Sequence, residues 1–420
     1  MNSLRFLTTL MLLAGFTTAV AQHNLQPEMQ NFRKPGFEGV NVFEAPKADT
    51  VKFEGLKVRL GGDFAMQFQG LSHSNSGNDT LVELGSNFNL PTANLNVDVQ
   101  MADGVRLHLR TYLSSRHHPE AWVKGGHLNI DKLDFVKPGF LAGVMDKVTI
   151  RVGLDEINYG DAHFRRSDNA SAMYNPFVGN YIIDGFTTEA FGEFYFRHNG
   201  FLVMAAVSNG KLNQSVVNGS EDTENTPSFY GKLGYDKQIN TDLRLRLTGS
   251  AYTNNGDQSI FLYNGDRASS RYYNVMDDIN GNGNDWSGRL TFTVPELTSF
   301  QINPFVKYKG FEFFGIYEMI SAKTFGRQDL TYTQLGAEAL YRFGAEDKLY
   351  IGGRYNAVTG DDSADGRDIT RFNVGGGWFL TDNIMAKVEY VQQNYEGDGW
   401  AGRFDEGEFS GVVVEAVVSF

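Results

Sequence analysis

The last thirteen residues of the chain, 408–420, constrain its fold more than any other stretch. They read EFSGVVVEAVVSF, and every second residue counted back from Phe420 is apolar: Val418, Ala416, Val414 and Val412. Because side chains alternate between two faces along a β-strand, these residues form one apolar face of a terminal strand. Two folds use such a strand: a membrane barrel, whose outside meets lipid, and a soluble β-sandwich, whose core the face would join.

Composition favours the barrel. The 420 residues contain no apolar run of about 18 residues, which excludes membrane-spanning helices. Mean hydropathy is −0.33 although the chain has 33 Phe and 19 Tyr. A barrel reconciles the two values, because half of each strand faces lipid and half faces water. The absence of Cys excludes disulfides, thiolate metal sites and an acylated lipoprotein anchor.

The first 21 residues have the pattern of a secretory signal peptide. Arg5 is followed by the apolar stretch 6–16 and by the small-residue site Ala19-Val20-Ala21, which predicts cleavage before Gln22. The mature chain would keep 36 of the 37 basic residues against 50 acidic ones, a net charge of −14. This balance argues against nucleic acid as a partner.

Residues 22–55 are polar and lack a sustained period, and they include Pro27, Pro35 and Pro46. We expect them to be an N-terminal extension in the periplasm. A small plug and a partner-docking arm both remain open for this segment. The barrel itself is predicted to span residues 56–420.

From residue 56 onward, alternating segments recur between turns and loops, as expected for an antiparallel up-and-down all-β transmembrane barrel. The sixteen predicted strands are 56–70, 92–101, 105–113, 121–131, 147–154, 187–197, 200–208, 228–236, 242–253, 286–294, 311–320, 330–343, 348–357, 369–380, 383–394 and 408–420.

The order of short turns and long loops tests this count, since both chain ends of such a barrel lie in the periplasm. The predicted outer loops are 71–91, 114–120, 155–186, 209–227, 254–285, 321–329, 358–368 and 395–407. The pattern requires 295–310, with Pro295 and Pro304, to be a periplasmic connection. If 300–308 spans the membrane instead, a further strand must lie within 254–285 and the barrel has eighteen strands.

Basic residues fall on the face of the early strands that would point into the lumen. Charged side chains facing lipid are costly, so these residues are expected to line water. They are either the polar lining of a hydrated lumen or a basic wall that attracts anions. The set is Lys57, Arg59, Arg106, His108, Arg110, Arg151, Lys232, Arg244 and Arg246.

The loop 155–186 combines charges and aromatic rings. It is either a constriction folded into the lumen, where acidic groups would face the basic wall, or a solvated loop on the outer surface. Its constriction candidates are Asp155, Glu156, Asp161, Arg165, Arg166 and Asp168.

Signatures of enzymes and metal sites are weak in this sequence. The chain lacks a G-x-S-x-G, H-E-x-x-H or P-loop motif, so we predict no enzyme and no cofactor. The adjacent His117 and His118 are best explained as solvated residues. Two loops approach a calcium-binding spacing but lack the twelfth-position Glu, and flexible polar loops explain them better. Their residues are Asp278, Asn280, Asn282, Asp361 and Asp365.

With these features in place, the chain resembles bacterial outer-membrane porins, in particular the phosphate-selective porin O/P type. The resemblance rests on Arg151-Val152-Gly153, Arg165-Arg166-Ser167-Asp168, the FNVGGGW stretch 372–378 and the terminal residues 417–420. In trimeric porins the third outer loop forms the constriction, and 155–186 has that position.

The resemblance and the pattern together predict a diffusion channel for small hydrophilic solutes in the bacterial outer membrane, with a bias to anions. The alternative is a closed structural or partner-docking barrel without transport. The expected partners are outer-membrane lipid, the solutes and the barrel-assembly machinery, which would recognise the strand ending in Phe420. The resemblance also makes a homotrimer a candidate assembly.

Overall fold

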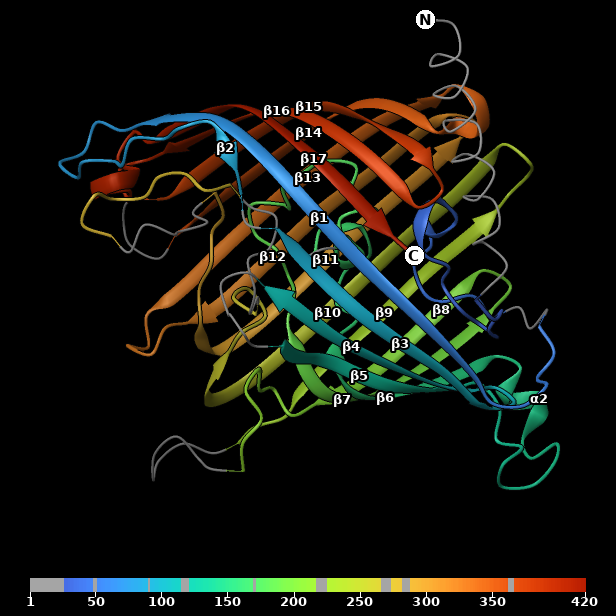
Figure 1. Cartoon of the computed structure of the whole chain (residues 1–420). Helices are drawn as coiled ribbons and strands as arrows, with labels where there is room; N and C mark the ends of the chain where they lie inside the picture. The colour runs from blue at the N-terminus through green and yellow to red at the C-terminus, as the bar shows by residue number, and fades with distance from the viewer. Residues whose placement is uncertain are drawn as a thin grey trace, which may run out of the picture.

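The computed structural model describes residues 26–47, 51–89, 91–114, 121–168, 171–216, 225–265, 273–281, 288–361 and 366–420. These residues form one closed antiparallel barrel of sixteen long strands, with the two-residue strand β2 attached to β1 (Figure 1). The strands are β1 (Lys57–Ser74), β2 (Asn87–Phe88), β3 (Thr92–Ala102), β4 (Val105–Ser114), β5 (Ala121–Ile130), β6 (Val148–Glu156), β7 (Thr188–His198), β8 (Phe201–Ser208), β9 (Ser228–Gln238), β10 (Leu243–Ile260), β11 (Val294–Tyr308), β12 (Phe311–Lys323), β13 (Asp329–Phe343), β14 (Leu349–Asp361), β15 (Asp368–Thr381), β16 (Ile384–Glu396) and β17 (Glu408–Ser419).

Within the ranges given above, helical structure is confined to short turns. They are η2 (Gly36–Gly39), α2 (Ala142–Met145), η3 (Ala162–Arg165), η4 (Ala345–Asp347) and η5 (Gly402–Phe404). Among the described residues, no helix has the length and apolar character that crossing a membrane requires.

The terminal strand closes the barrel against the first strand, as predicted. β17 pairs with β1 from Asp63 opposite Ser419 to Ser74 opposite Glu408. Beyond the last paired residue, the Phe420 N–H donates to the Gly62 carbonyl at 3.0 Å, and the Gly62 N–H donates to the Phe420 carbonyl at 3.1 Å. A closed barrel leaves no strand edge unpaired, which is what allows a polar backbone to lie in lipid.

The two faces of the strands differ in the way the alternation predicts. On β17, Val412 and Val414 face outward and are 45% and 43% exposed. Glu415, the residue after Val414, faces inward and is fully buried. Outward-facing aromatic residues such as Phe68, Tyr341 and Tyr390 are likewise exposed. The outer surface is therefore an apolar band of the kind that meets lipid.

The prediction for the tenth strand is wrong. β11 begins at Val294 and runs through Pro295 and Pro304 to Tyr308, so 295–310 is a spanning strand and not a periplasmic connection. The described part of the predicted strand 286–294 is unpaired up to Val294. Pro304 is tolerated because the β11–β12 pairing skips Asn303 and Pro304 and resumes at Phe305, so that no N–H is needed there. Pro295 falls where the β10–β11 register breaks, between Asn255 and Ile260 of β10.

The strand count nevertheless remains sixteen, because β11 replaces the predicted strand and does not add to it. The alternative of eighteen strands is wrong for the same reason. The parity of turns and loops is preserved: the β11–β12 turn is Lys309-Gly310, at the end of the barrel that carries the C-terminus (Figure 1).

The N-terminal segment, residues 26–47, lies in the mouth of the barrel at this same end. The Phe37 N–H donates to the Asp382 carbonyl in the β15–β16 turn at 2.8 Å. The Asn41 amide donates to Glu312 on β12 at 2.7 Å, and Gln30 Nε2 donates to Asp103 in the β3–β4 turn at 2.8 Å. The segment therefore contacts opposite sides of the rim and fills part of the opening between them.

Candidate functional site: the lumen

The loop between β6 and β7, residues 157–187, crosses the inside of the barrel. The Ile182 N–H donates to Asn356 on β14 at 2.7 Å, and the Ile183 N–H donates to Gln334 on β13 at 3.0 Å. The Val178 N–H donates to Glu389 on β16 at 2.9 Å. These strands form the wall opposite β6, so the loop lies in the lumen and not on the outer surface.

Asp161 is the strongest link between this loop and the wall. Its carboxylate accepts from Lys232 at 2.9 Å, from Arg246 at 2.7 Å and from Thr248 at 2.7 Å. Burial alone would raise the pKa of Asp161, but Arg246 and Lys232 outweigh it and hold the pKa well below its ordinary value. Asp161 is therefore an anion at any physiological pH and neutralises two cations of the wall.

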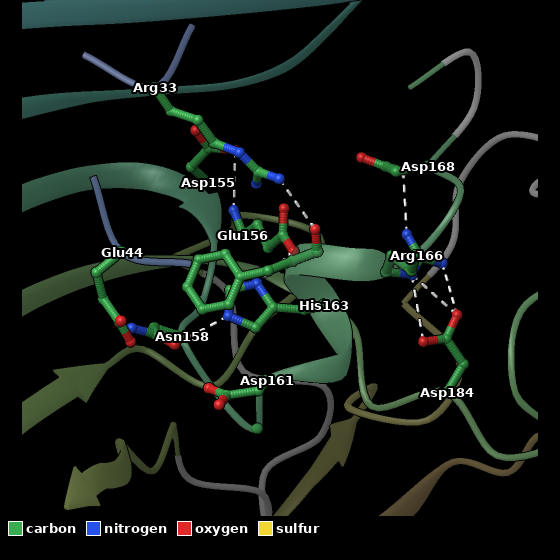
Figure 2. Close-up of polar contacts among 12 residues, drawn as sticks. Arg33, Glu44, Asp155, Glu156, Asn158, Asp161, His163, Arg166, Asp168 and Asp184 are labelled. Carbon is green, nitrogen blue, oxygen red and sulfur yellow. Dashed lines mark hydrogen bonds and ion pairs between the residues drawn. The ribbon is translucent and has the colours of Figure 1, made fainter. Parts of the chain in front are cut away.

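The other constriction candidates are also paired, and Figure 2 shows Arg166 between Asp168 and Asp184. Arg165 contacts Glu338 on β13 at 2.6 Å, and Arg166 binds Asp184 within the loop at 2.7 Å. Asp168 pairs with Lys124 on β5, and the Asp155 carboxylate accepts a hydrogen bond from His127 Nδ1 at 2.7 Å. Glu156 faces His163 Nδ1 at 2.7 Å (Figure 2).

Burial holds the pKa of His163 below its ordinary value, although Glu156 acts in the opposite direction. The other ring nitrogen of His163 contacts Asn158 at 2.9 Å. His163 is consequently a neutral, fully engaged side chain near neutral pH.

The nine residues of the basic wall lie on the lumen side of their strands. The loop reaches three of them: Lys232 and Arg246 meet Asp161, and Arg110 lies 3.8 Å from Asp168. Arg151 pairs within the wall, 3.7 Å from Asp155 on its own strand and 3.0 Å from Glu193 on β7. Carboxylates of the wall itself or of the mouth meet the others. Those contacts are Arg106 and His108 with Asp98, Arg244 with Asp236, and Lys57 with Glu54. Arg59 lies over the Phe32 ring of the N-terminal segment.

A cavity of about 270 Å³ remains between the N-terminal segment, the crossing loop and the wall formed by the early strands. Ser419 and Phe420 line it, so it lies towards the C-terminal end of the barrel. Seven guanidinium groups and three imidazoles surround it, against five carboxylates. The charged lining residues are Arg33, Arg59, Arg106, Arg110, Arg151, Arg166, Arg197, His108, His127, His163, Glu44, Asp63, Asp98, Glu156 and Asp168.

Several donors of this cavity have no partner among the described residues. Arg106 Nε, Asn129 Nδ2 and Arg197 Nε are buried without a hydrogen bond. Arg106 and Asn129 face each other across the β4–β5 pair. Buried donors without partners are costly, and a small anion in the cavity would supply acceptors for them.

A second loop, between β10 and β11, also enters the lumen, which the sequence reading did not anticipate. The Asn274 N–H donates to Gln69 on β1 at 3.1 Å, and the Leu290 N–H donates to the Ile182 carbonyl of the crossing loop at 2.9 Å. Leu262, Val275 and Met276 are fully buried. The apolar run Phe261-Leu262-Tyr263 in an otherwise polar loop was the available signal.

Together the two loops build an apolar cluster across the barrel. Ile182 and Ile183 of the first loop pack with Leu262 and Val275 of the second and with Tyr230 of the wall. The lumen thus has a packed apolar centre, and the charged cavity lies between this centre and the C-terminal end of the barrel.

The calcium candidates do not form a site within the described ranges. Asp278 Oδ1 accepts from the Asn280 backbone N–H at 2.8 Å, which is a local turn contact. The described residues do not include Asn282, Asp365, His117 or His118. They include the backbone of Asp361 but not its side chain. No group of three or more His, Asp or Glu that could hold a metal occurs in the part of the chain that is described.

Comparison with known proteins relates the chain to porins by fold. No family model and no curated protein matches the chain. An anion-selective porin from Comamonas acidovorans aligns with a TM-score of 0.54 and 11% identity, over 87% of this chain and 100% of that one. The outer membrane channel DcaP of Acinetobacter baumannii aligns with a TM-score of 0.51 and 10% identity, over 88% and 99%. OmpT, an outer membrane protein of Vibrio cholerae, aligns with a TM-score of 0.51 and 11% identity, over 89% of this chain and 100% of that one.

At such low identity the likeness establishes the fold alone. The phosphate-selective type is not among these matches, so that part of the resemblance is not confirmed. The closed barrel of sixteen strands, its apolar outer band and these neighbours show that the chain has the fold of bacterial outer-membrane porins.

Proposed function

We propose that the protein is a porin-type channel through which small hydrophilic solutes diffuse, with a preference for anions. The observation that carries the anion preference is the surplus of cations around the cavity, seven guanidinium groups against five carboxylates before any histidine is counted. Charged groups in a confined, low-dielectric passage attract counter-ions and repel co-ions. The net charge of −14 expected for the mature chain comes from residues outside the cavity lining, and it does not set the electric field inside the cavity.

The basic wall and the crossing loop have distinct roles in this proposal. Wall residues such as Arg106 and Arg110 provide the attraction. The loop residues Asp161 and Asp168 oppose them and narrow the passage, which limits solutes by size and charge.

Reversal potentials in planar bilayers under a salt gradient test the proposal. We expect anion preference for the wild type and a reduced preference for Arg106→Gln, which removes one cation from the cavity. Arg327→Gln is the matched control, because Arg327 is an exposed arginine paired with Glu296 and Asp257 outside the barrel. Cation preference of the wild type would overturn the anion part, and the absence of any conductance would overturn the channel.

A second candidate is a closed structural or partner-docking barrel. The apolar cluster that spans the lumen, with Ile182, Leu262 and Val275, favours it. This function predicts no solute uptake by proteoliposomes even after residues 26–47 are removed, together with loss of partner binding in the same variant. Uptake after removal would decide for the channel. Hydrolysis of a substrate, abolished by a single Ser or His substitution, would be needed to place the chain among outer-membrane enzymes.

We further propose that the protein assembles as a homotrimer and that the barrel-assembly machinery recognises residues 408–420. One solved form of Vibrio cholerae OmpT with this fold is a trimer. The mass of the detergent-solubilised protein tests the first point. Removal of Phe420 tests the second, and we expect less folded barrel in the membrane.

A further inference from the structure

The connection between β5 and β6, residues 131–147, stands apart from the other turns at the C-terminal end of the barrel. It has seventeen residues, whereas the other turns at that end have two to five. A tight hairpin would suffice to join two neighbouring antiparallel strands. We call this connection the foot.

The outer part of the foot, residues 135–144, is mostly apolar. Residues 135–144 are all exposed, and Lys137 is the single charged residue among them. The large apolar side chains are Phe135 at 59% exposure, Val136 at 60%, Phe140 at 40%, Leu141 at 50% and Val144 at 53%. Contiguous exposed apolar surface of this kind marks an interaction site.

Part of the backbone of the foot is hydrogen-bonded within the segment. The N–H groups of Phe140, Val144 and Met145 donate to carbonyls within the segment at 2.9 Å each. The Gly139 N–H donates to the Asp134 carboxylate at 2.9 Å. Met145 is buried and ties the foot to the barrel. These internal hydrogen bonds lower the cost of placing the segment against an apolar medium.

The position of the foot continues the lipid-facing band. Figure 1 shows the segment around α2 projecting beyond the rim and away from the barrel axis. Directly above it, Val152 of β6 and Phe194 and Phe196 of β7 are exposed on the outer face. Phe196 pairs with Val148, the first residue of β6 after the foot. The apolar surface therefore runs without a break from the barrel wall onto the foot.

We propose that the foot inserts into the periplasmic leaflet of the outer membrane and anchors the rim beside the N-terminal segment. Its aromatic and aliphatic side chains would lie at the boundary between headgroups and acyl chains, and Lys137 would extend to the lipid phosphates. Lys47 of the N-terminal segment binds Asp131 at the base of the foot at 2.8 Å, so the lipid anchor and the mouth of the barrel are physically joined.

Site-directed spin labelling tests this, because the chain has no native Cys. Val144→Cys is labelled in the full mature barrel and reconstituted into vesicles of phosphatidylethanolamine and phosphatidylglycerol. Val216→Cys is the matched control, since Val216 is 97% exposed in an outer loop. Accessibility to oxygen, which partitions into lipid, is compared with accessibility to a water-soluble nickel chelate.

We expect the oxygen-to-nickel accessibility ratio at residue 144 to be several-fold higher than at residue 216. Phe140→Cys should give the same result and replaces Val144→Cys if that variant folds poorly. A ratio equal to that of residue 216 would mean that the foot is in water and would overturn the proposal. Protection from both reagents would indicate a protein partner, and strong dipolar coupling between labels a second copy of this chain; either would also overturn it.

Discussion

Glu44 of the N-terminal segment and Arg246 on β10 form a bidentate ion pair inside the barrel. Arg246 Nη1 lies 2.8 Å from Glu44 Oε2, and Arg246 Nη2 lies 3.0 Å from Glu44 Oε1. The same guanidinium holds Asp161 of the crossing loop. One arginine of the wall thus ties together the N-terminal segment and the crossing loop.

Acid should release the N-terminal segment. Burial alone would raise the pKa of Glu44, but Arg246 and Lys232 outweigh it and hold the pKa at about 2. Docking of the N-terminal segment lowers the pKa of Glu44. The ion pair therefore stabilises the docked segment fully above pH 4.5, the ordinary pKa of Glu, and this stabilisation is lost as the pH falls towards 2. We expect hydrogen exchange of residues 26–47 to accelerate over this range, while exchange of β17 does not.

Glu44→Gln is the control for this effect. The variant should exchange faster at neutral pH and should show a smaller change on acidification. A wild-type segment that stays protected at pH 2 would contradict the role of Glu44.

Removal of residues 26–47 should increase single-channel conductance. Phe43 and Glu44 occupy the mouth, with the Phe43 ring centroid 5.3 Å from that of Phe305 on β11. Deleting the segment widens this opening. Deletion of the exposed outer-loop residues 213–216 is the comparison and should leave conductance unchanged. Equal conductance of all three proteins would show that the N-terminal segment does not limit flow.

Asp161→Asn should destabilise the barrel strongly. The substitution removes one of the two buried carboxylates that neutralise Lys232 and Arg246 and leaves only Glu44 in that role. Breaking a buried ion pair costs roughly 3 kcal/mol or more. Asp257→Asn is a matched control, because Asp257 binds Arg327 at 2.6 Å on the exposed surface, where a pair contributes at most about 1 kcal/mol. Thermal unfolding measures both. Similar shifts for the two variants would contradict a central role for Asp161.

Gly62→Ala should weaken the seam between β1 and β17. A Cβ at Gly62 would lie 2.9 Å from the Phe420 ring and 3.1 Å from the Asn94 carbonyl. Relieving this overlap would cost about 1–3 kcal/mol. Gly249→Ala on β10 is the control, since nothing lies within 4 Å of the added carbon. Heat stability of the folded barrel should fall for the first variant only, and unchanged stability would mean that Phe420 can shift freely.

Most of the barrel is predictable from sequence because its physical origin is local. A period of two residues follows from strand geometry, and the lipid outside requires the outward residues to be apolar. Val412, Val414 and Val418 therefore predict a lipid-facing strand. The position of both chain ends on one side of the membrane determines which connections are short turns and which are long loops. This reasoning identified fifteen of the sixteen long strands and the closure of β17 on β1.

The strand it missed shows where local rules end. Pro304 argues against a central strand when read alone, but β12 leaves a gap in its pairing opposite this residue. Whether a missing N–H matters depends on the partner strand, which sequence periodicity does not reveal.

The sequence by itself determined that this chain is a membrane barrel and which face of the correctly predicted strands points inward, while it left sixteen and eighteen strands open. Only the tertiary structure decided what fills the barrel. The contacts that bring the loops and the N-terminal segment into the lumen join residues far apart in the chain: Glu44 with Arg246, Ile182 with Asn356, and Asn274 with Gln69. Such pairs leave no periodic trace, because each depends on a matching donor and acceptor that the closed barrel alone brings together.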